Sequence, residues 1–260
     1  MKRPFLRRLY LLCLITGVLS TCGRNIQDNN KPADEAAKIN LQLGVEYMRR
    51  EKHDIALNKL QKALMLDNNY ADAHNAIAVL YERLKLDDEA KRHYQKALTL
   101  KPKDSDTHNN YGQFLCRHKQ WKKAEKHFLI ALENPVYRSP EIPYTNAGLC
   151  LRNINSTKAE EYLRQALQKN PQFPRALYQM ADLSYNQERY VQAQRYLQRY
   201  IEIAKHTPKT LWLGIRIEDA LNNGSETARY ASMLRQDFPD ASETHLLNQS
   251  IGNTTRNHVQ

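Results

Sequence analysis

The sequence predicts an all-α protein in which an antiparallel pair of helices is repeated along the chain. Small residues recur in steps of 34, 34, 36 and 33 residues, at Gly44, Ala78, Gly112, Gly148 and Ala181. The same frame of neighbours returns around them, as Ile77, Tyr81, Ala90, Tyr94, Ala97 and Pro102, and then as Tyr111, Leu115, Ala124, Phe128, Ala131 and Pro135. With only 8 glycines and 26% charged residues, the composition suits continuous helices with a hydrated surface.

This pattern resembles the tetratricopeptide repeat, a helix pair of about 34 residues in which small residues lie where two helices touch. The resemblance extends from Ala36 to Pro239, so we place the repeat domain at 35–240. It implies a superhelix of antiparallel helix pairs with about six units, each packed only on its neighbours.

The first three units follow the frame closely. The first pairs helices expected at 36–50 and 54–66, and its apolar residues recur at helical spacing, at Leu43, Tyr47, Leu57, Leu60 and Leu64. The second begins at Ala71. The third begins at Ser105, after Pro102 and a capping Asp104, which are stop and start signals for helices.

The later units are less regular. The fourth gains two residues near 135–143, where three prolines predict a bend or surface loop, and loses one after Gly148. The fifth begins at Pro174. The sixth, from Pro208 to Pro239, loses most of its small residues, as expected of a degenerate capping unit. Residues 241–260 read as a polar C-terminal tail.

The N-terminus has the layout of an export signal. Four cations in residues 1–8 precede an apolar run of 11 residues, Leu9–Leu19, which is too short to span a bilayer. The following stretch, 19–23, resembles a bacterial lipobox, which implies a signal peptide at 1–21 and a lipidated Cys22. Thr21 departs from the small residue usual before that cysteine. An ordinary signal peptide with an incidental cysteine is the alternative.

The residues after Cys22 suggest where the chain is held. Arg24 stands where an Asp commonly retains lipoproteins in the inner membrane, so the resemblance implies the periplasmic face of the outer membrane. Residues 23–33 are polar and lack periodicity, which predicts a flexible tether. With the lipidated cysteine that the lipobox resemblance implies, this segment spans residues 22–34.

The net charge of +11 does not indicate nucleic-acid binding. Removing residues 1–22 takes away four cations, which leaves 35 minus 28, or +7. The remaining cations are interleaved with acidic residues along the helices, and no nucleic-acid module is present in the sequence. We interpret the charge as a solvated surface.

The sequence carries no catalytic motif, so we expect a protein that is not an enzyme and needs no cofactor or small-molecule substrate. Histidines take equivalent places in adjacent units, His74 with His108 and His93 with His127. No third ligand type recurs with them, so we expect structural histidines and no metal site.

Two cysteines, Cys116 and Cys150, lie late in the first helices of units three and four, which are neighbours in the array. In an oxidising periplasm such a pair predicts a disulfide. The bridge would close a loop of about 34 residues and would stabilise the folded state by about 3 kcal/mol. Two buried free thiols are the alternative.

Partner binding is expected in the groove that the first helices line in tetratricopeptide arrays. The positions that face this groove are Val45, Asn75, Val79, Asn109, Asn110, Gln113, Asn146, Leu149 and Tyr178. Their amides could grip the backbone of an extended segment, or simply face water. The cations with which chaperone-tail receptors hold a terminal carboxylate are missing, since those places carry Leu41, Asp106 and Asn110, or one unit later Asn75, Ile142 and Asn146.

The lipobox, the tether, the repeats and the stretch 212–216 together resemble the PilW/PilF family of type IV pilus biogenesis lipoproteins. That resemblance implies a monomeric outer-membrane scaffold or pilotin, which binds the secretin or another pilus-machine protein and promotes secretin multimer assembly, its localisation, or pilus stability. The alternatives are a general periplasmic lipoprotein adaptor in envelope assembly and a regulator of a peptidoglycan synthase.

Overall fold

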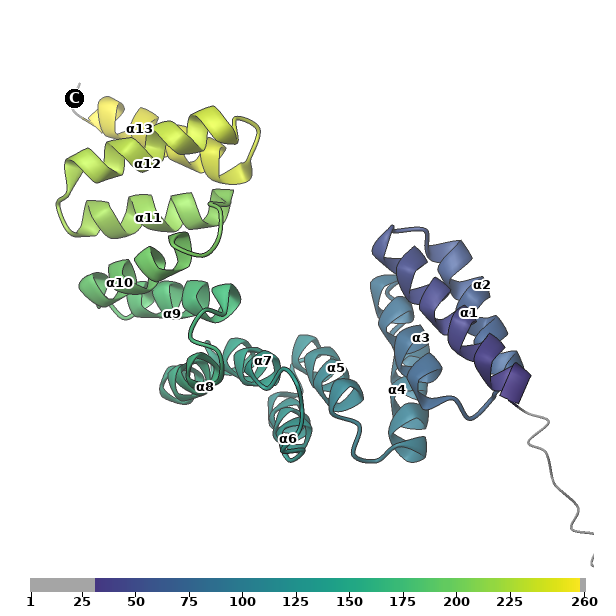
Figure 1. Cartoon of the computed structure of the whole chain (residues 1–260). Coiled ribbons are helices and arrows are strands. Elements are labelled where there is room, and N and C mark those ends of the chain that lie inside the picture. Colours follow the sequence, from purple (N-terminus) through teal and green to yellow (C-terminus); the bar gives the residue numbers. More distant parts are fainter. Residues whose placement is uncertain (1–30, 258–260) are drawn as a thin grey trace, which may run out of the picture.

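A computed structural model describes residues 31–257, in which thirteen helices and no strand are found. The helices form six consecutive antiparallel pairs, which confirms the predicted fold class (Figure 1). The predicted signal peptide, Cys22 and most of the tether lie outside the described residues. The pairs are α1 (Lys31–Arg49) with α2 (His53–Leu66), α3 (Ala71–Arg83) with α4 (Asp87–Leu100), α5 (Ser105–Arg117) with α6 (Trp121–Leu132), α7 (Glu141–Leu151) with α8 (Ser156–Lys169), α9 (Pro174–Asn186) with α10 (Tyr190–Ile201), and α11 (Pro208–Ala220) with α12 (Gly224–Asp237).

The pairs stack into a curved superhelix. Each second helix contacts the first helix of the next unit, and consecutive first helices also touch, from α1 on α3 to α9 on α11. In the middle of the chain α5, α7 and α9 lie toward the inner side of the bend, with α6, α8 and α10 outside them (Figure 1). The first helices therefore form the inner surface.

The turn inside most units is closed by one residue with left-handed backbone. These residues are Glu51, Lys85, Lys119, Glu188 and Asn222, with φ between 58° and 61°. In the third unit, for example, the Lys119 N–H donates to the Cys116 carbonyl at 3.0 Å and the Gln120 N–H to the Leu115 carbonyl at 2.9 Å. The pair of bonds satisfies carbonyls at the helix end and reverses the chain.

The fourth unit turns differently, at the residues where the sequence loses one position. There the N–H groups of Ile154 and Asn155 both donate to the Leu151 carbonyl, at 2.8 and 2.7 Å. The Asn155 side chain then caps α8 by accepting from the Lys158 N–H. The fourth unit therefore accommodates the loss of one residue here, and α7 and α8 still form an antiparallel pair.

The recurring small residues let two helices approach closely. Gly112 of α5 faces the fully buried ring of Phe128 in α6, and Gly148 of α7 faces Leu163 in α8. A Cβ atom built on Gly112 would lie 2.7 Å from the Phe128 ring. This contact explains the periodic small residue, because any larger side chain would push the pair apart.

Apolar residues are exposed at the N-terminal edge of the described array. At the N-terminal edge Ile39 and Leu43 are 48% and 39% exposed, whereas the residues one unit later, Ala73 and Ile77, are buried by the preceding helices. The expected tether is also shorter than predicted, since residues 31–34 already belong to α1.

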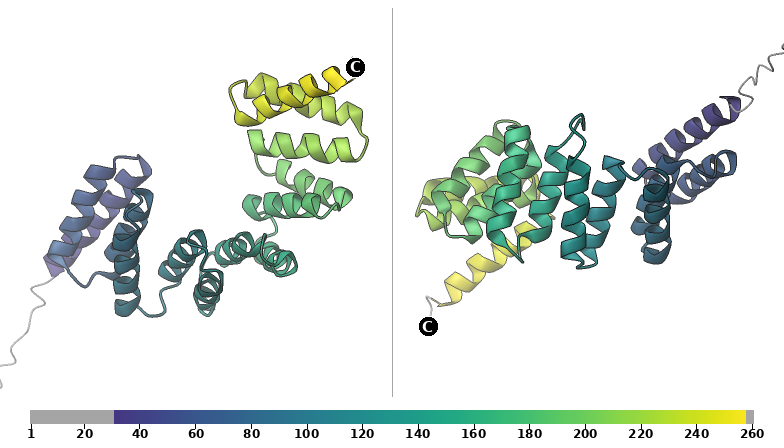
Figure 2. Two further views of the ribbon diagram at one scale, coloured as in Figure 1. Left: turned by 180° about the vertical axis from the view of Figure 1, so that it is seen from behind. Right: turned by 90° about the horizontal axis from the view of Figure 1, so that it is seen from below.

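The prediction of a polar tail at 241–260 is wrong for most of that segment. Residues 242–257 form α13 (Ser242–Asn257), which packs on α11 and α12 as a final layer (Figure 2). Leu247 and Thr244 are buried in that contact, and the Thr244 hydroxyl donates to the Phe238 carbonyl at 2.6 Å. The helix covers the apolar end of unit six. Within the range 31–257, no helix is both long and apolar enough to cross a membrane.

Candidate partner-binding groove

A cleft of about 720 Å³ opens on the first helices of units one and two. Its apolar residues include Val45, which is 47% exposed, and the half-buried Val79. Amides of Asn75 and Asn110 lie beside them, so the cleft combines an apolar base with hydrogen-bonding groups. The full lining is Leu41, Gln42, Val45, Glu46, Met48, Arg49, Asp72, Asn75, Ala76, Val79, Arg83 and Asn110.

A smaller cleft of about 250 Å³ continues the first one toward unit three. The two share Val79, Arg83 and Asn110, and the second adds Gln113 and Arg117. We call the two together the groove. It brings together five of the nine predicted positions, namely Val45, Asn75, Val79, Asn110 and Gln113.

The predicted asparagines bond mainly to one another. The Asn146 amide donates to Asn109 Oδ1 at 2.8 Å, the Asn109 amide reaches Asn110 Oδ1 at 3.4 Å, and the Asn110 amide donates to Asn75 Oδ1 at 3.2 Å. The chain of amides links units two, three and four. It leaves the Asn75 amide group and one proton on Asn110 for a ligand.

Four of the nine predicted groove residues do not line the groove. Asn109 and Asn146 are only 6% and 3% exposed and lie between first helices, so they support the array rather than meet a partner. Leu149 and Tyr178 are half-buried in units four and five and line neither cleft. Burial raises the pKa of Tyr178 above its ordinary value, and its ring packs against the central core.

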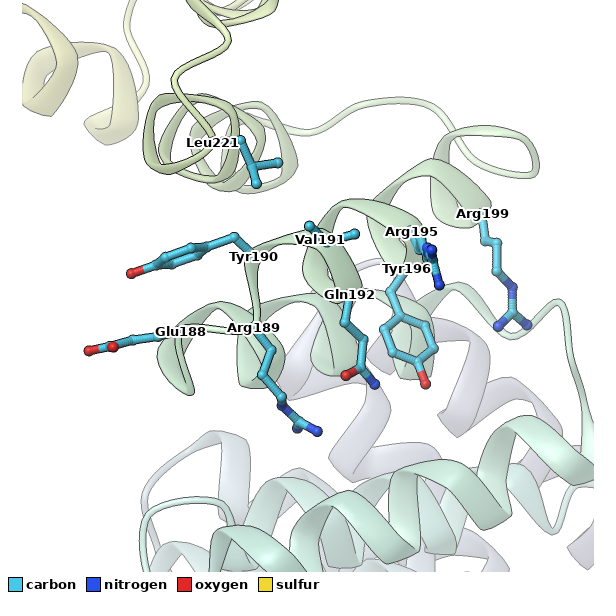
Figure 3. A pocket seen from close by; sticks show the side chains of 9 residues that line it. All are labelled: Glu188, Arg189, Tyr190, Val191, Gln192, Arg195, Tyr196, Arg199 and Leu221. Atoms are coloured by element: carbon cyan, nitrogen blue, oxygen red, sulfur yellow. The ribbon is translucent and has the colours of Figure 1, made fainter.

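A separate cleft of about 680 Å³ lies beside α10, where Val191 of α10 faces Leu221 at the end of α11 (Figure 3). Tyr190, Arg195 and Arg199 of α10 also line it. This surface is not among the predicted sites, although tyrosine and arginine alternate along residues 190–199. Second helices contribute most of its lining, so it lies apart from the groove.

The structure brings Cys116 and Cys150 together. Their Cα atoms are 5.7 Å apart, inside the range that a disulfide spans, and the two Sγ atoms meet between α5 and α7. The separation of 34 residues would join units three and four across the proline-rich linker.

We expect the protein to carry this bridge in an oxidising compartment. Mass spectrometry after alkylation without reductant should find neither Cys116 nor Cys150 modified, and reduction should lower the free energy of unfolding by about 3 kcal/mol. A Cys116→Ala and Cys150→Ala variant provides the control, because its stability should not respond to reductant. Two alkylated thiols in the native protein would contradict the bridge.

The equivalent histidines form two pairs of tilted rings, His74 with His93 and His108 with His127. His74 Nδ1 lies 3.0 Å from His93 Nδ1, and His108 Nδ1 lies 2.8 Å from His127 Nδ1. His74 Nε2 is 3.1 Å from the Asn68 carbonyl, which can only accept, so His74 carries its proton there and accepts one from His93. In the described part of the chain, no three His, Cys, Asp or Glu side chains gather as a metal site would require.

The paired rings give the protein an acid-sensitive element. Burial, followed by the neighbouring histidine, lowers the pKa of His93 and of His127 to about 4. Because the folded state holds these rings neutral, their contribution is complete above the ordinary histidine pKa of about 6.5 and is lost as the pH falls toward 4.

We therefore expect the melting temperature to fall between pH 7 and pH 5. With allowance for solvent screening of half-buried rings, the loss is about 1 kcal/mol for each pair. A His74→Leu and His93→Tyr variant copies unit five, which has Leu177 and Tyr196 at these places. Differential scanning calorimetry should show a shallower pH dependence for this variant, and an unchanged slope would contradict the assignment.

Comparison with known proteins accounts for the architecture. Models of the tetratricopeptide repeat match residues 44–85, 71–104, 93–126 and 155–209. The type IV pilus assembly protein PilF of Pseudomonas aeruginosa is 30% identical over 237 residues, covering 90% of this chain and 94% of the relative. The chain belongs to the PilF/PilW family.

Two solved structures of this family have the same fold. One, from a functional characterisation of Pseudomonas aeruginosa PilF, has a TM-score of 0.74 and 30% identity, over 85% of this chain and all of the other. The other is PilW, a widely conserved type IV pilus biogenesis factor, with a TM-score of 0.74 and 31% identity over 81% of this chain and 97% of PilW. The family's two named members thus act in type IV pilus formation.

Proposed function

We propose that this protein is a lipid-anchored scaffold of type IV pilus biogenesis, held at the periplasmic face of the outer membrane. It binds the pilus secretin, or another protein of the pilus machine, and promotes assembly or localisation of the secretin multimer. Membership of the PilF/PilW family supports the pilus role. The groove on units one and two is the observation that carries the binding role.

The position of the groove fits an anchored scaffold. α1 starts at Lys31, so eight residues separate the proposed lipid anchor at Cys22 from the groove-forming helices. Acyl chains on Cys22 would restrict the protein to a surface and raise its effective concentration toward a membrane-embedded partner. Binding through a repeat array requires no catalytic group, which agrees with the absence of a catalytic motif from the sequence.

The heat- and detergent-resistant secretin multimer is the first measurement. We expect it to collapse to monomer in membranes that lack this protein, and a wild-type copy to restore it. Cys22→Ala should restore it poorly, because the protein would then lose its anchor. If the multimer persists but surface fibres vanish, the role lies in pilus stability, and if both persist the proposal is wrong.

A matched pair of variants tests the groove. Val45→Asp with Val79→Asp places two carboxylates on the apolar base of the cleft and should abolish complementation. Val136→Asp is the control, because Val136 is 81% exposed in the linker after α6, outside the groove. Both proteins should accumulate and show helical circular dichroism. Equal complementation by the two variants would contradict a role for the groove.

A further inference from the structure

Three arginines occupy the same place in the first three units. Arg49, Arg83 and Arg117 follow one another at intervals of 34 residues, each in the last turn of a first helix. All three line the groove. The equivalent residues of units four, five and six are Asn153, Asn186 and Asp219, so this row of cations ends where the groove ends.

The row is only partly neutralised by the protein. Glu46 pairs with both Arg49 and Arg50, at 2.7 Å each, and Glu82 pairs with Arg117. Arg83 donates to the Met48 carbonyl at 3.0 Å, and in the described part of the chain no carboxylate forms an ion pair with it. Asp72 also lines the groove, but it pairs with Lys101 at 2.7 Å. The three arginines of the row therefore meet two carboxylates, those of Glu46 and Glu82, which leaves a net charge of +1 along the row.

The arginines keep contact with solvent. The side chains of Arg49 and Arg117 are 77% and 56% exposed. A guanidinium group has five N–H donors in a planar fork. An arginine that already donates to one carboxylate can therefore donate to a second carboxylate from another edge of the group. Beside the row lie the apolar Val45 and Val79 and the amide of Asn75, which can bind a peptide backbone.

We propose that the groove selects an extended acidic segment of the partner, whose carboxylates pair with Arg49, Arg83 and Arg117. Apolar side chains of the same segment contact Val45 and Val79. The inference rests on the proposed function and adds the chemistry of the segment that is bound. It differs from terminal-carboxylate recognition, because the cations form a row along the array and no chain end is required.

Geometry also indicates the spacing of the acidic residues. The first helices α1, α3 and α5 pack on one another, and packed helices lie about 8–10 Å apart. A segment in the extended polyproline II conformation advances about 3.1 Å per residue and repeats every three residues, so a carboxylate at every third residue would lie on one side and meet successive arginines. Because the contacts are partly exposed ion pairs, binding should weaken as salt is added.

Fluorescence anisotropy with a labelled peptide of repeated Glu-Val-Ser triplets tests the inference. We expect this peptide to bind about tenfold more tightly at low salt than the same peptide with Gln in place of Glu. The triple variant Arg49→Gln, Arg83→Gln, Arg117→Gln should lose this preference. The control Lys62→Gln, Lys91→Gln, Lys122→Gln removes the same charge from exposed positions on second helices and should keep it.

Arg83→Gln alone is a second variant, which keeps the test valid if the triple variant misfolds. It removes one cation and leaves the ion pairs of Glu46 and Glu82 intact. It should weaken Glu-peptide binding and leave Gln-peptide binding unchanged. Equal binding of the two peptides, no binding of either, or an unchanged preference in both arginine variants would overturn the inference. None of these results would alter the secretin-multimer outcome, which judges the proposed function separately.

Discussion

Gly112→Val should lower the free energy of unfolding by about 3 kcal/mol. A Cβ atom at this position would lie 2.7 and 2.8 Å from two atoms of the Phe128 ring, which is fully buried and has no room to move. The added methyl groups of valine would force α5 and α6 apart at the centre of the array. Urea denaturation followed by circular dichroism at 222 nm measures the change.

The matched control is Gly224→Val. Gly224 is exposed at the start of α12, and a Cβ atom built on it meets nothing within 4 Å. The same substitution there should change stability by less than about 0.5 kcal/mol. If both variants lose equal stability, the effect reflects helix propensity and the close contact with Phe128 is unimportant.

Leu247→Asp should detach α13 from the end of the array. Leu247 is 4% exposed and packs in the cluster formed by Leu211, Ile215, Tyr230 and Leu234. Burying an unpaired carboxylate there is unfavourable by several kcal/mol, more than a single terminal helix gains from its contact, so the helix should unfold locally. Limited proteolysis should then cut after residue 241 at a much higher rate than in the wild type.

The neighbouring residue supplies the control. Leu246 is 48% exposed, so Leu246→Asp introduces the same carboxylate on the solvent side of α13 and should leave the cleavage rate unchanged. Equal cleavage of the two variants, or resistance of both, would show that α13 does not cover unit six as the structure indicates.

Much of the fold could be predicted from the sequence, because the contacts that define a repeat are local. The small residue at 44, 78, 112, 148 and 181 and the large residue facing it lie in the same unit, so their spacing is visible in the chain. The same reasoning located the shortened turn after Gly148. It failed for α13, whose polar sequence carries a single buried leucine and lacks the signature of a helix pair.

The groove could be predicted only in part. Val45 and Val79 lie in it as expected, since a position in the frame determines which face of a helix a residue occupies. The spacing of the repeat does not determine how deeply a side chain is buried between two units. For this reason Asn109 and Asn146 were expected in the groove, whereas the structure buries them between first helices. The row of arginines was visible as a spacing of 34 residues, but its relation to the cleft required the structure.

The N-terminal edge of the described array has a consequence for how the groove works. A unit at the end of a linear array loses one interface when it opens, whereas an inner unit loses two. The C-terminal end is covered by α13, whereas Ile39 and Leu43 meet water at the N-terminal edge, so the unit of α1 and α2 should open more readily than the inner units. The helix that carries Val45 and Arg49 should therefore exchange its amide hydrogens faster than the first helices of the inner units. A ligand that bridges units one and two would slow that exchange, so recognition and ordering of the first repeat are a single event.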